Sequence, residues 1–135
     1  PLKSMGVNKT SLSAGQLIRD ILLSAPEVTK RTRKIFPVVT DEARLPYILY
    51  RRTAYQQKPT KRRGEPGADL LQMEVICYTA DYAEGVELAE AVRGALDNIE
   101  GKDDDLVMRS CTLQDAEESW QDDAYLQQLV FNINI

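Results

Sequence analysis

The stretch LPYILYRRTAYQQKPTKRRGEPGADLLQMEVICYT, residues 45–79, decides the fold that the sequence predicts. Its two ends, residues 45–55 and 71–79, alternate with a period of two and are rich in aromatic and β-branched side chains, as strands are. Residues 56–67 between them contain two prolines and two glycines. Because these residue types disfavour regular structure, we expect a long β-hairpin with an irregular tip.

The tip of this hairpin is strongly basic. Four cations stand in residues 56–67 against a single acid, Glu65, and they are Lys58, Lys61, Arg62 and Arg63. Two more, Arg51 and Arg52, lie in the strand that leads to the tip. We therefore expect a protruding cationic hairpin, and its six basic residues are candidates either for contacts with a neighbouring copy or for the lining of a lumen.

The remaining segments place this hairpin in an α+β domain. Apolar residues recur with helical spacing over 14–25 and again over 81–99, where Asp81 is a suitable N-cap. The expected inner stripe of the second helix is Tyr82, Val86, Ala89, Val92, Leu96 and Ile99, and Gly94 is expected to permit close packing on the sheet. Strand patterns cover 35–39, 106–113 and 128–135, and Pro37 in the first of them favours an edge position. The order α-β-β-β-α-β-β predicts a mainly antiparallel sheet of four to five strands with two helices packed on one face.

A chain of 135 residues fits one domain, which we expect to cover 11–135. Residues 1–10 are expected to be disordered or, in part, left by an expression vector. No apolar run approaches the roughly 18 residues needed to span a bilayer, so we expect no membrane partner.

Charge is distributed unevenly along the chain. Residues 1–67 carry 14 Lys and Arg against 5 acids, whereas residues 68–135 carry 3 against 16. Interleaved strands would cancel much of this difference in space. Alternatively, a basic edge of one copy meets an acidic edge of an identical neighbour, and such head-to-tail contacts close into rings or continue as filaments. The expected acidic edge consists of Asp115, Glu117, Glu118, Asp122 and Asp123.

The single tryptophan, Trp120, stands in the acidic segment 114–123. It either folds back onto the core or anchors a partner, and the sequence favours the core. Both cysteines, Cys77 and Cys111, fall in expected strands, and they are predicted to be buried free thiols.

No pattern for catalysis or for binding a cofactor or metal is present. The chain has no histidine, which removes the usual general base and the commonest metal ligand. The run Asp103–Asp105 lacks the ligand spacing of a calcium loop, and no phosphate-binding or nucleophile motif occurs. We therefore expect a protein that is not an enzyme, with no catalytic residues, metal or cofactor.

Basic residues 30–34 form a second cationic cluster. A solvated connection accounts for it, and so does a surface that faces nucleic acid, although no aromatic residues interleave to stack on bases. With the cluster at 58–63, it makes a stand-alone nucleic-acid-binding module the alternative to a structural protein.

A series of short motifs between Gln16 and Leu96 carries a family resemblance. The helix Gln16–Leu23 precedes Lys34-Ile35-Phe36-Pro37 and Leu45-Pro46-Tyr47, and Tyr82-Ala83-Glu84 opens the second long helix. This order resembles the small tail-completion proteins of tailed bacteriophages and prophages, a group similar to tail-terminator and tail-to-head joining proteins. The basic tip and the acidic segment 114–123 depart from the family pattern.

The resemblance implies a non-enzymatic structural protein of the virion tail that is assembled in the bacterial cytoplasm. Proteins of this kind form rings, typically hexamers, that complete the tail and join it to the head. The implied partners are further copies of the chain, tail-tube proteins and head-connector proteins, with DNA passing through the lumen.

Overall fold

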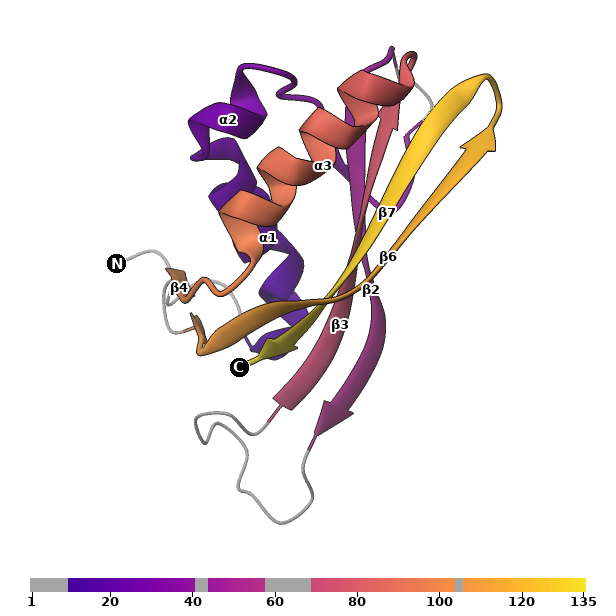
Figure 1. Ribbon diagram of the computed structural model, residues 1–135. Coiled ribbons are helices and arrows are strands. Elements are labelled where there is room, and N and C mark those ends of the chain that lie inside the picture. Colours follow the sequence, from indigo (N-terminus) through magenta and orange to yellow (C-terminus); the bar gives the residue numbers. More distant parts are fainter. Residues whose placement is uncertain (1–9, 41–43, 58–68, 104–105) are drawn as a thin grey trace.

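The fold is a five-stranded sheet with helices on one face (Figure 1). The computed structural model describes residues 10–40, 44–57, 69–103 and 106–135. The sheet order is β1-β2-β3-β7-β6, and only the β1–β2 pair is parallel. The predicted α+β class, the mainly antiparallel sheet and the packing of the helices on one face are therefore confirmed.

The central hairpin is formed by β2 (Tyr47–Gln57) and β3 (Asp69–Thr79). The two strands pair from Tyr47 opposite Tyr78 down to Gln57 opposite Asp69. A bulge between Arg52 and Ala54 shifts the alternation, so the lower part of β2 has a different phase from the upper part. The basic tip predicted at Lys58, Lys61, Arg62 and Arg63 lies outside the described residues.

Two long strands complete the other side of the sheet. Strand β7 (Ala124–Asn134) pairs with β3, and β6 (Ser110–Gln121) pairs with β7 and forms one edge. The opposite edge is the three-residue strand β1 (Ile35–Pro37), as Pro37 predicted. A small separate hairpin consists of β4 (Gly101–Asp103) and β5 (Leu106–Met108).

Capping residues and Pro26 mark where the helices begin. Helix α1 (Ala14–Leu23) follows a 3-10 turn at Ser11–Ser13, and Pro26 opens the short helix α2 (Pro26–Thr29). Helix α3 (Tyr82–Leu96) has the predicted cap, because Asp81 Oδ2 accepts from the Glu84 N–H at 3.2 Å.

The core lies between the helices and one face of the sheet. Burying these apolar side chains supplies most of the driving force for folding, at roughly 25 cal/mol per Å². The largest fully buried side chains come from all layers and include Ile18, Leu22, Ile35, Ile48, Met73, Leu88, Leu96, Met108, Phe131 and Ile133. The central hairpin and the helices thus share one core.

Two local expectations were wrong, one for the acidic segment 114–123 and one for the inner side of α3. The segment 114–123 is not a separate polar stretch, because β6 runs through it to Gln121 and turns directly into β7. On α3, Tyr82 and Val86 were expected to face the core, yet they are 47% and 36% exposed. The buried stripe is centred instead on Leu88, Val92 and Leu96.

A glycine packs closely on the sheet, but at another position than the sequence suggested. A Cβ on Gly94 would have nothing within 4 Å, whereas a Cβ on Gly85 would lie 2.8 Å from Thr79 Oγ1. Gly85, in the first turn of α3, is therefore the residue that allows the helix to approach β3.

Candidate interaction surfaces

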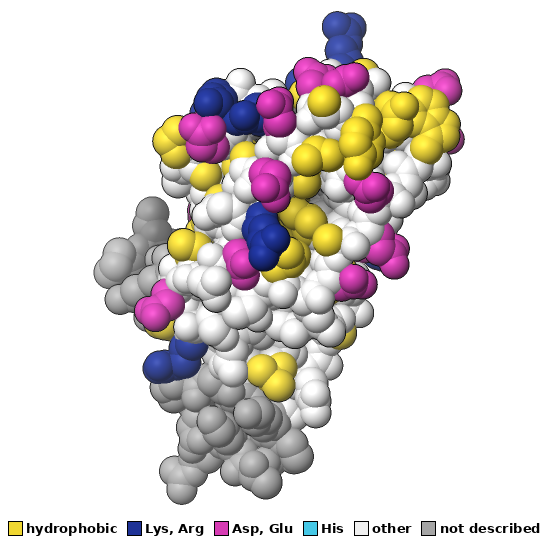
Figure 2. All heavy atoms as spheres, viewed as in Figure 1, with side chains coloured by type: hydrophobic (Ala, Val, Ile, Leu, Met, Phe, Trp, Pro, Cys, Tyr) yellow, Lys and Arg dark blue, Asp and Glu magenta, His cyan; other side chains and the backbone are white. Residues whose placement is uncertain are grey.

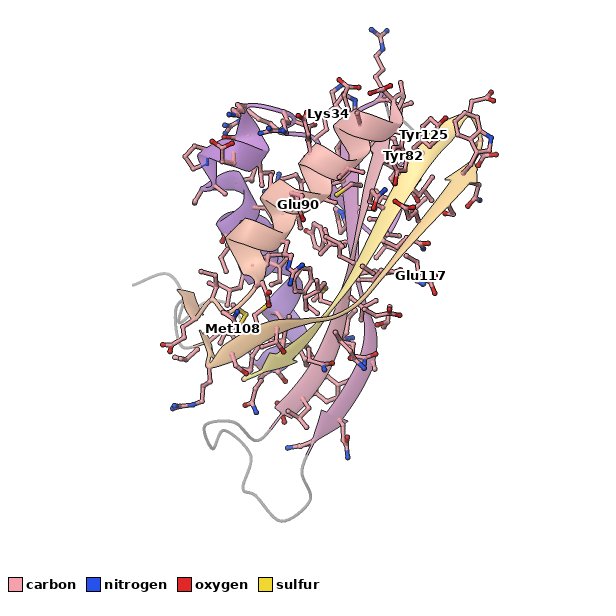
Figure 3. The ribbon with its side chains drawn as sticks, viewed as in Figure 1. Lys34, Tyr82, Glu90, Met108, Glu117 and Tyr125 are labelled. Carbon is pink, nitrogen blue, oxygen red and sulfur yellow. The ribbon has the colours of Figure 1, made fainter. Side chains whose placement is uncertain are left out.

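The outer edge of β6 is long, acidic and exposed. Residues 114–121 are all exposed, and the edge has no strand beyond it in the described part of the sheet. Figure 3 shows Glu117 on this outer side of the sheet. Of the residues expected to form an acidic edge, Asp115, Glu117 and Glu118 lie on β6, and Asp122 and Asp123 lie in the turn that follows. Glu118 is on the helix side of the strand, where it bonds to Tyr82, and Glu117 is on the opposite face because successive strand residues alternate. We call these five residues the acidic edge.

The turn at the end of β6 has two residues with positive φ, Asp122 at 52° and Asp123 at 62°. Two such residues between paired strands form the tight hairpin turn whose twist matches the strands. Gln121 pairs with Ala124 across it. This turn makes β6 and β7 a continuous hairpin that extends beside α3 (Figure 1).

Of the basic residues expected to contact a partner, two are described. Arg51 Nε lies 2.8 Å from Glu74 Oε1 in an ion pair between β2 and β3. The Arg52 guanidinium lies 5.5 Å from the centre of the Tyr55 ring, and it donates to the Leu12 carbonyl at 3.4 Å. Both residues are exposed, and both lie on β2, three strands away from β6. The described basic residues therefore lie toward the β1 edge of the sheet, and the acidic residues of β6 lie at the other edge.

An aromatic cluster lies between the end of the β6–β7 hairpin and the start of α3. The Trp120 and Tyr125 rings are 4.7 Å apart at 68°, and the Tyr82 and Tyr125 rings are 5.8 Å apart at 74°. These edge-to-face contacts are the geometry that aromatic pairs prefer. We call Trp120, Tyr82 and Tyr125 the aromatic cluster.

Glu118 connects the aromatic cluster to β7 by two hydrogen bonds. Its Oε2 accepts from the Tyr82 hydroxyl at 2.7 Å and from Gln127 Nε2 at 2.9 Å. These bonds, the one from Gln127 above all, lower the pKa of Glu118, and the bond to Glu118 raises the pKa of Tyr82. The carboxylate therefore links β6, β7 and α3.

The expectation that Trp120 folds into the core was wrong. Its side chain is 55% exposed, and its ring packs on Tyr125 at the surface. Figure 2 shows a diagonal band of hydrophobic side chains, flanked by acidic ones, at this end of the molecule. Sequence reasoning missed this cluster because Tyr82 has the spacing of the helix core and because polar residues surround Trp120.

A second apolar surface lies between α2 and α3. A groove of about 540 Å³ is lined by Ala25, Pro26, Glu27, Arg31, Val86, Glu87, Glu90, Ala91, Gly94 and Ala95. Arg31 at its rim already contacts Glu27 at 3.3 Å, so the acids at the rim outnumber the free cations.

No described helix or strand packs on the sheet face opposite the helices, but Leu45 packs against part of it. Tyr47 and Tyr78 stack on it with ring centres 4.5 Å apart, close to a small buried cluster of Ile76, Ala124 and Leu126. Its lower half is neutral and amide-rich, since Gln72 Nε2 donates to Gln114 at 2.6 Å and to Asn132 at 3.3 Å. This face therefore changes from aromatic to amide-rich along the strands.

The two cysteines are confirmed as buried free thiols. Burial raises the pKa of each, from 9.0 to about 12, and the nearby Asp97 adds to the rise at Cys111. Among the described residues, no three acidic, cysteine or histidine side chains come together in a way that could hold a metal ion. The side chains of the Asp103–Asp105 run lie outside what the structure describes. In the described part of the chain, no helix is long and apolar enough to cross a membrane.

The described residues form an α+β domain whose sheet has acidic residues at its β6 edge and basic residues toward its β1 edge. The fold is shared with a solved chain from the "Virion of native gene transfer agent (GTA) particle", at a TM-score of 0.69 and 14% sequence identity. The alignment covers 95% of this chain and 98% of that one. No family model matches the sequence, and no curated protein matches it.

Proposed function

We propose that this protein is a non-enzymatic structural component of a phage or prophage tail, and that its copies form a ring, six in number, that completes the tail and joins it to the head. The observation that carries the proposal is the acidic edge of β6, exposed along one side of a sheet whose other side is basic. The shared fold with a virion chain and the family resemblance of residues 16–96 support it.

Strand directions suit a head-to-tail contact. Because β7 runs parallel to β2 and β6 runs antiparallel to β7, β6 is antiparallel to both β2 and β1. A rotation around an axis along the strands leaves these directions unchanged. The β6 edge of one copy would therefore meet the β1–β2 edge of the next as an antiparallel neighbour, with the helices of every copy on the same side of the ring.

The electrostatic arrangement gives the contact a single direction. An acidic edge repels another acidic edge and attracts a basic one, so the two-fold alternative is disfavoured. The basic side begins with Arg51 and Arg52, and we propose that Lys58, Lys61, Arg62 and Arg63 extend it or line the lumen through which DNA passes. Tail-tube and head-connector proteins would bind the two ends of the ring within the virion tail, after assembly in the bacterial cytoplasm.

Absolute mass in solution tests the ring. Light scattering on a sizing column at low salt should give about 90 kDa for six copies of the 15.2 kDa chain, and the particle should dissociate as salt screens the edges. The double variant Asp115→Lys/Glu117→Lys should remain monomeric. The control Glu87→Lys/Glu90→Lys makes the same charge change on the outer side of α3 and should assemble normally.

Two results would contradict the proposal. A monomer at all salt and protein concentrations would refute self-assembly through these edges. If that monomer also bound DNA with a steep salt dependence, the alternative of a nucleic-acid-binding module would replace the ring.

A further inference from the structure

Trp120 is exposed but held in a fixed position. Tyr125 packs against its ring, Tyr82 packs against Tyr125, and Glu118 bonds to the Tyr82 hydroxyl. A large apolar side chain that is 55% exposed and already ordered loses little conformational freedom when a partner covers it. Such residues are common anchors of protein interfaces.

The charges around Trp120 select the partner. Its neighbours along the hairpin are the acids of the acidic edge, Glu118 on one side and Asp122 and Asp123 on the other. An indole ring attracts a cation placed over its face, and the surrounding carboxylates strengthen that attraction. The chemistry of this surface therefore fits an arginine or lysine side chain.

The strand pairing places basic side chains at the opposite edge of the sheet, at the same height along the strands as Trp120. Glu118 pairs with Gln127, Gln127 with Cys77, Cys77 with Ile48, and Ile48 with Ile35. Ile35 is thus level with Glu118 across all five strands. Since β1 is antiparallel to β6, the residues just before Ile35 are level with those just after Glu118. Arg33 and Lys34 consequently lie level with Trp120 and Ser119.

The described residues at this end of the β1 edge include three exposed cations, and Arg19 of α1 donates to the Ile35 carbonyl beside them at 3.2 Å. Arg33, Lys34 and Arg44 are exposed, and Lys34 Nζ donates to the Arg44 carbonyl at 3.1 Å. Figure 3 shows Lys34 at the same end of the molecule as Tyr82 and Tyr125.

Apolar side chains follow on the same edge, since Val38 and Val39 are 63% and 74% exposed. Val38 also has a positive φ of 62°, a conformation that costs energy for a β-branched residue. By the same ladder Pro37 lies level with Ala116, so Val38 and Val39 lie toward the other end of β6 and not level with Trp120. Of the exposed side chains on the β1 edge, the cations Arg33 and Lys34 are therefore the ones level with the tryptophan end of β6.

We propose that Trp120 is the anchor of the contact between two copies of this chain, and that Arg33 and Lys34 of the second copy cover it. The inference rests on the proposed self-assembly and specifies which residues carry it. It gives the basic cluster at residues 30–34 a protein partner instead of a nucleic acid. In this contact the aromatic cluster supplies most of the binding energy, and the acidic edge around it determines which edge of the second copy can bind.

Because the chain contains one tryptophan, its fluorescence reports directly on this contact. Dilution of the assembled protein should shift the emission to longer wavelength and should raise quenching by acrylamide several-fold as Trp120 returns to solvent. The mass measured by light scattering should fall over the same concentration range.

Variants separate the anchor from the rest of the interface. Trp120→Ala should raise the dissociation constant at least about tenfold, as loss of an interface hot spot does. The control Val107→Ala removes another exposed apolar side chain, on β5, and should assemble normally. Lys34→Glu should weaken assembly, and combining it with Glu117→Lys should restore it. Circular dichroism checks that each variant folds.

The failures of the two proposals can be told apart. A particle of the expected mass whose tryptophan remains as quenchable as in the diluted protein would overturn the anchor and leave the ring standing. Normal assembly of Trp120→Ala would overturn the anchor as well. A monomer under every condition would refute the self-assembly itself, and the anchor with it.

Discussion

Two glycines in helix α3 allow a matched test of how the helix packs on the sheet. Replacing Gly94 with alanine should stabilise the protein, because a new Cβ would have nothing within 4 Å and alanine is the better helix former. The expected gain in the free energy of unfolding is about 1 kcal/mol. The same replacement at Gly85 would place a Cβ 2.8 Å from Thr79 Oγ1.

Thr79 has little freedom to move away. It is 1% exposed, its hydroxyl donates to the Asp81 carbonyl at 2.8 Å, and its β-branched side chain is stiff at χ1. Overpacking of this kind costs roughly 1–3 kcal/mol. After the helix-propensity gain of about 1 kcal/mol is subtracted, Gly85→Ala should be neutral or should destabilise by up to about 2 kcal/mol.

The assay is urea denaturation followed by circular dichroism at one protein concentration, so that any self-association contributes equally. The two variants should differ by about 1–3 kcal/mol, with Gly94→Ala the more stable. Equal stabilisation by both replacements would refute the close approach of α3 to β3. A loss of stability in Gly94→Ala would show that this side of the helix is covered.

Four further predictions concern the thiols, Glu118 and the core. Cys77 and Cys111, with pKa values of about 12, should not react with Ellman's reagent in the folded protein at pH 8 but should react fully in urea. Because each folded pKa lies above the unfolded value near 9, stability should be full below pH 9 and should fall by about 1.4 kcal/mol per thiol and pH unit up to about pH 12, as alkaline unfolding curves will show. Tyr82→Phe removes one of the two hydrogen bonds to Glu118 and should raise the pKa of that carboxyl toward its ordinary value. In an NMR titration, the carboxyl should therefore protonate at higher pH than in the parent protein. An unchanged titration would mean that the hydrogen bond from Gln127 alone lowers the pKa of Glu118. Phe131→Ala, in the fully buried centre of the sheet, should cost about 3–5 kcal/mol in the same urea assay, and a loss below 1 kcal/mol would contradict the core described above.

Local patterns predicted most elements of the fold, but the strand expected at 106–113 is in fact divided between β5 and β6, and β4 was not predicted. The alternation in 47–55 and 71–79 predicted the central hairpin, Pro37 predicted an edge strand, and Asp81 predicted the start of α3. Each of these signals depends on neighbouring residues in the chain, because a strand's period, a missing backbone N–H and a helix cap are all local properties.

The candidate surface was predicted only in part. The acidic residues at 115–123 were identified from charge alone, and the structure places them on the edge strand β6 and in the turn after it; their role as a partner surface stays a prediction. The sequence did not predict that Trp120, Tyr82 and Val86 are exposed. For the two helix residues, the reason is that helical spacing does not reveal how far along its length a helix stays in contact with the sheet. Helix α3 begins beside the end of the β6–β7 hairpin, where Tyr82 meets Tyr125 and its hydroxyl reaches Glu118.

By itself, then, the sequence determined the α+β class, the hairpins, the buried thiols and the separation of charge along the chain, since composition and short-range periodicity specify these. Only the tertiary structure decided which residues share a level across the sheet. The four strand pairings place Arg33 level with Trp120, and Lys34 level with Ser119, at the other edge of the same sheet. The tertiary structure also moves Trp120 from an expected core position to the surface. The physical reason is that register and helix placement minimise the free energy of the whole core at once, which no local window of sequence contains.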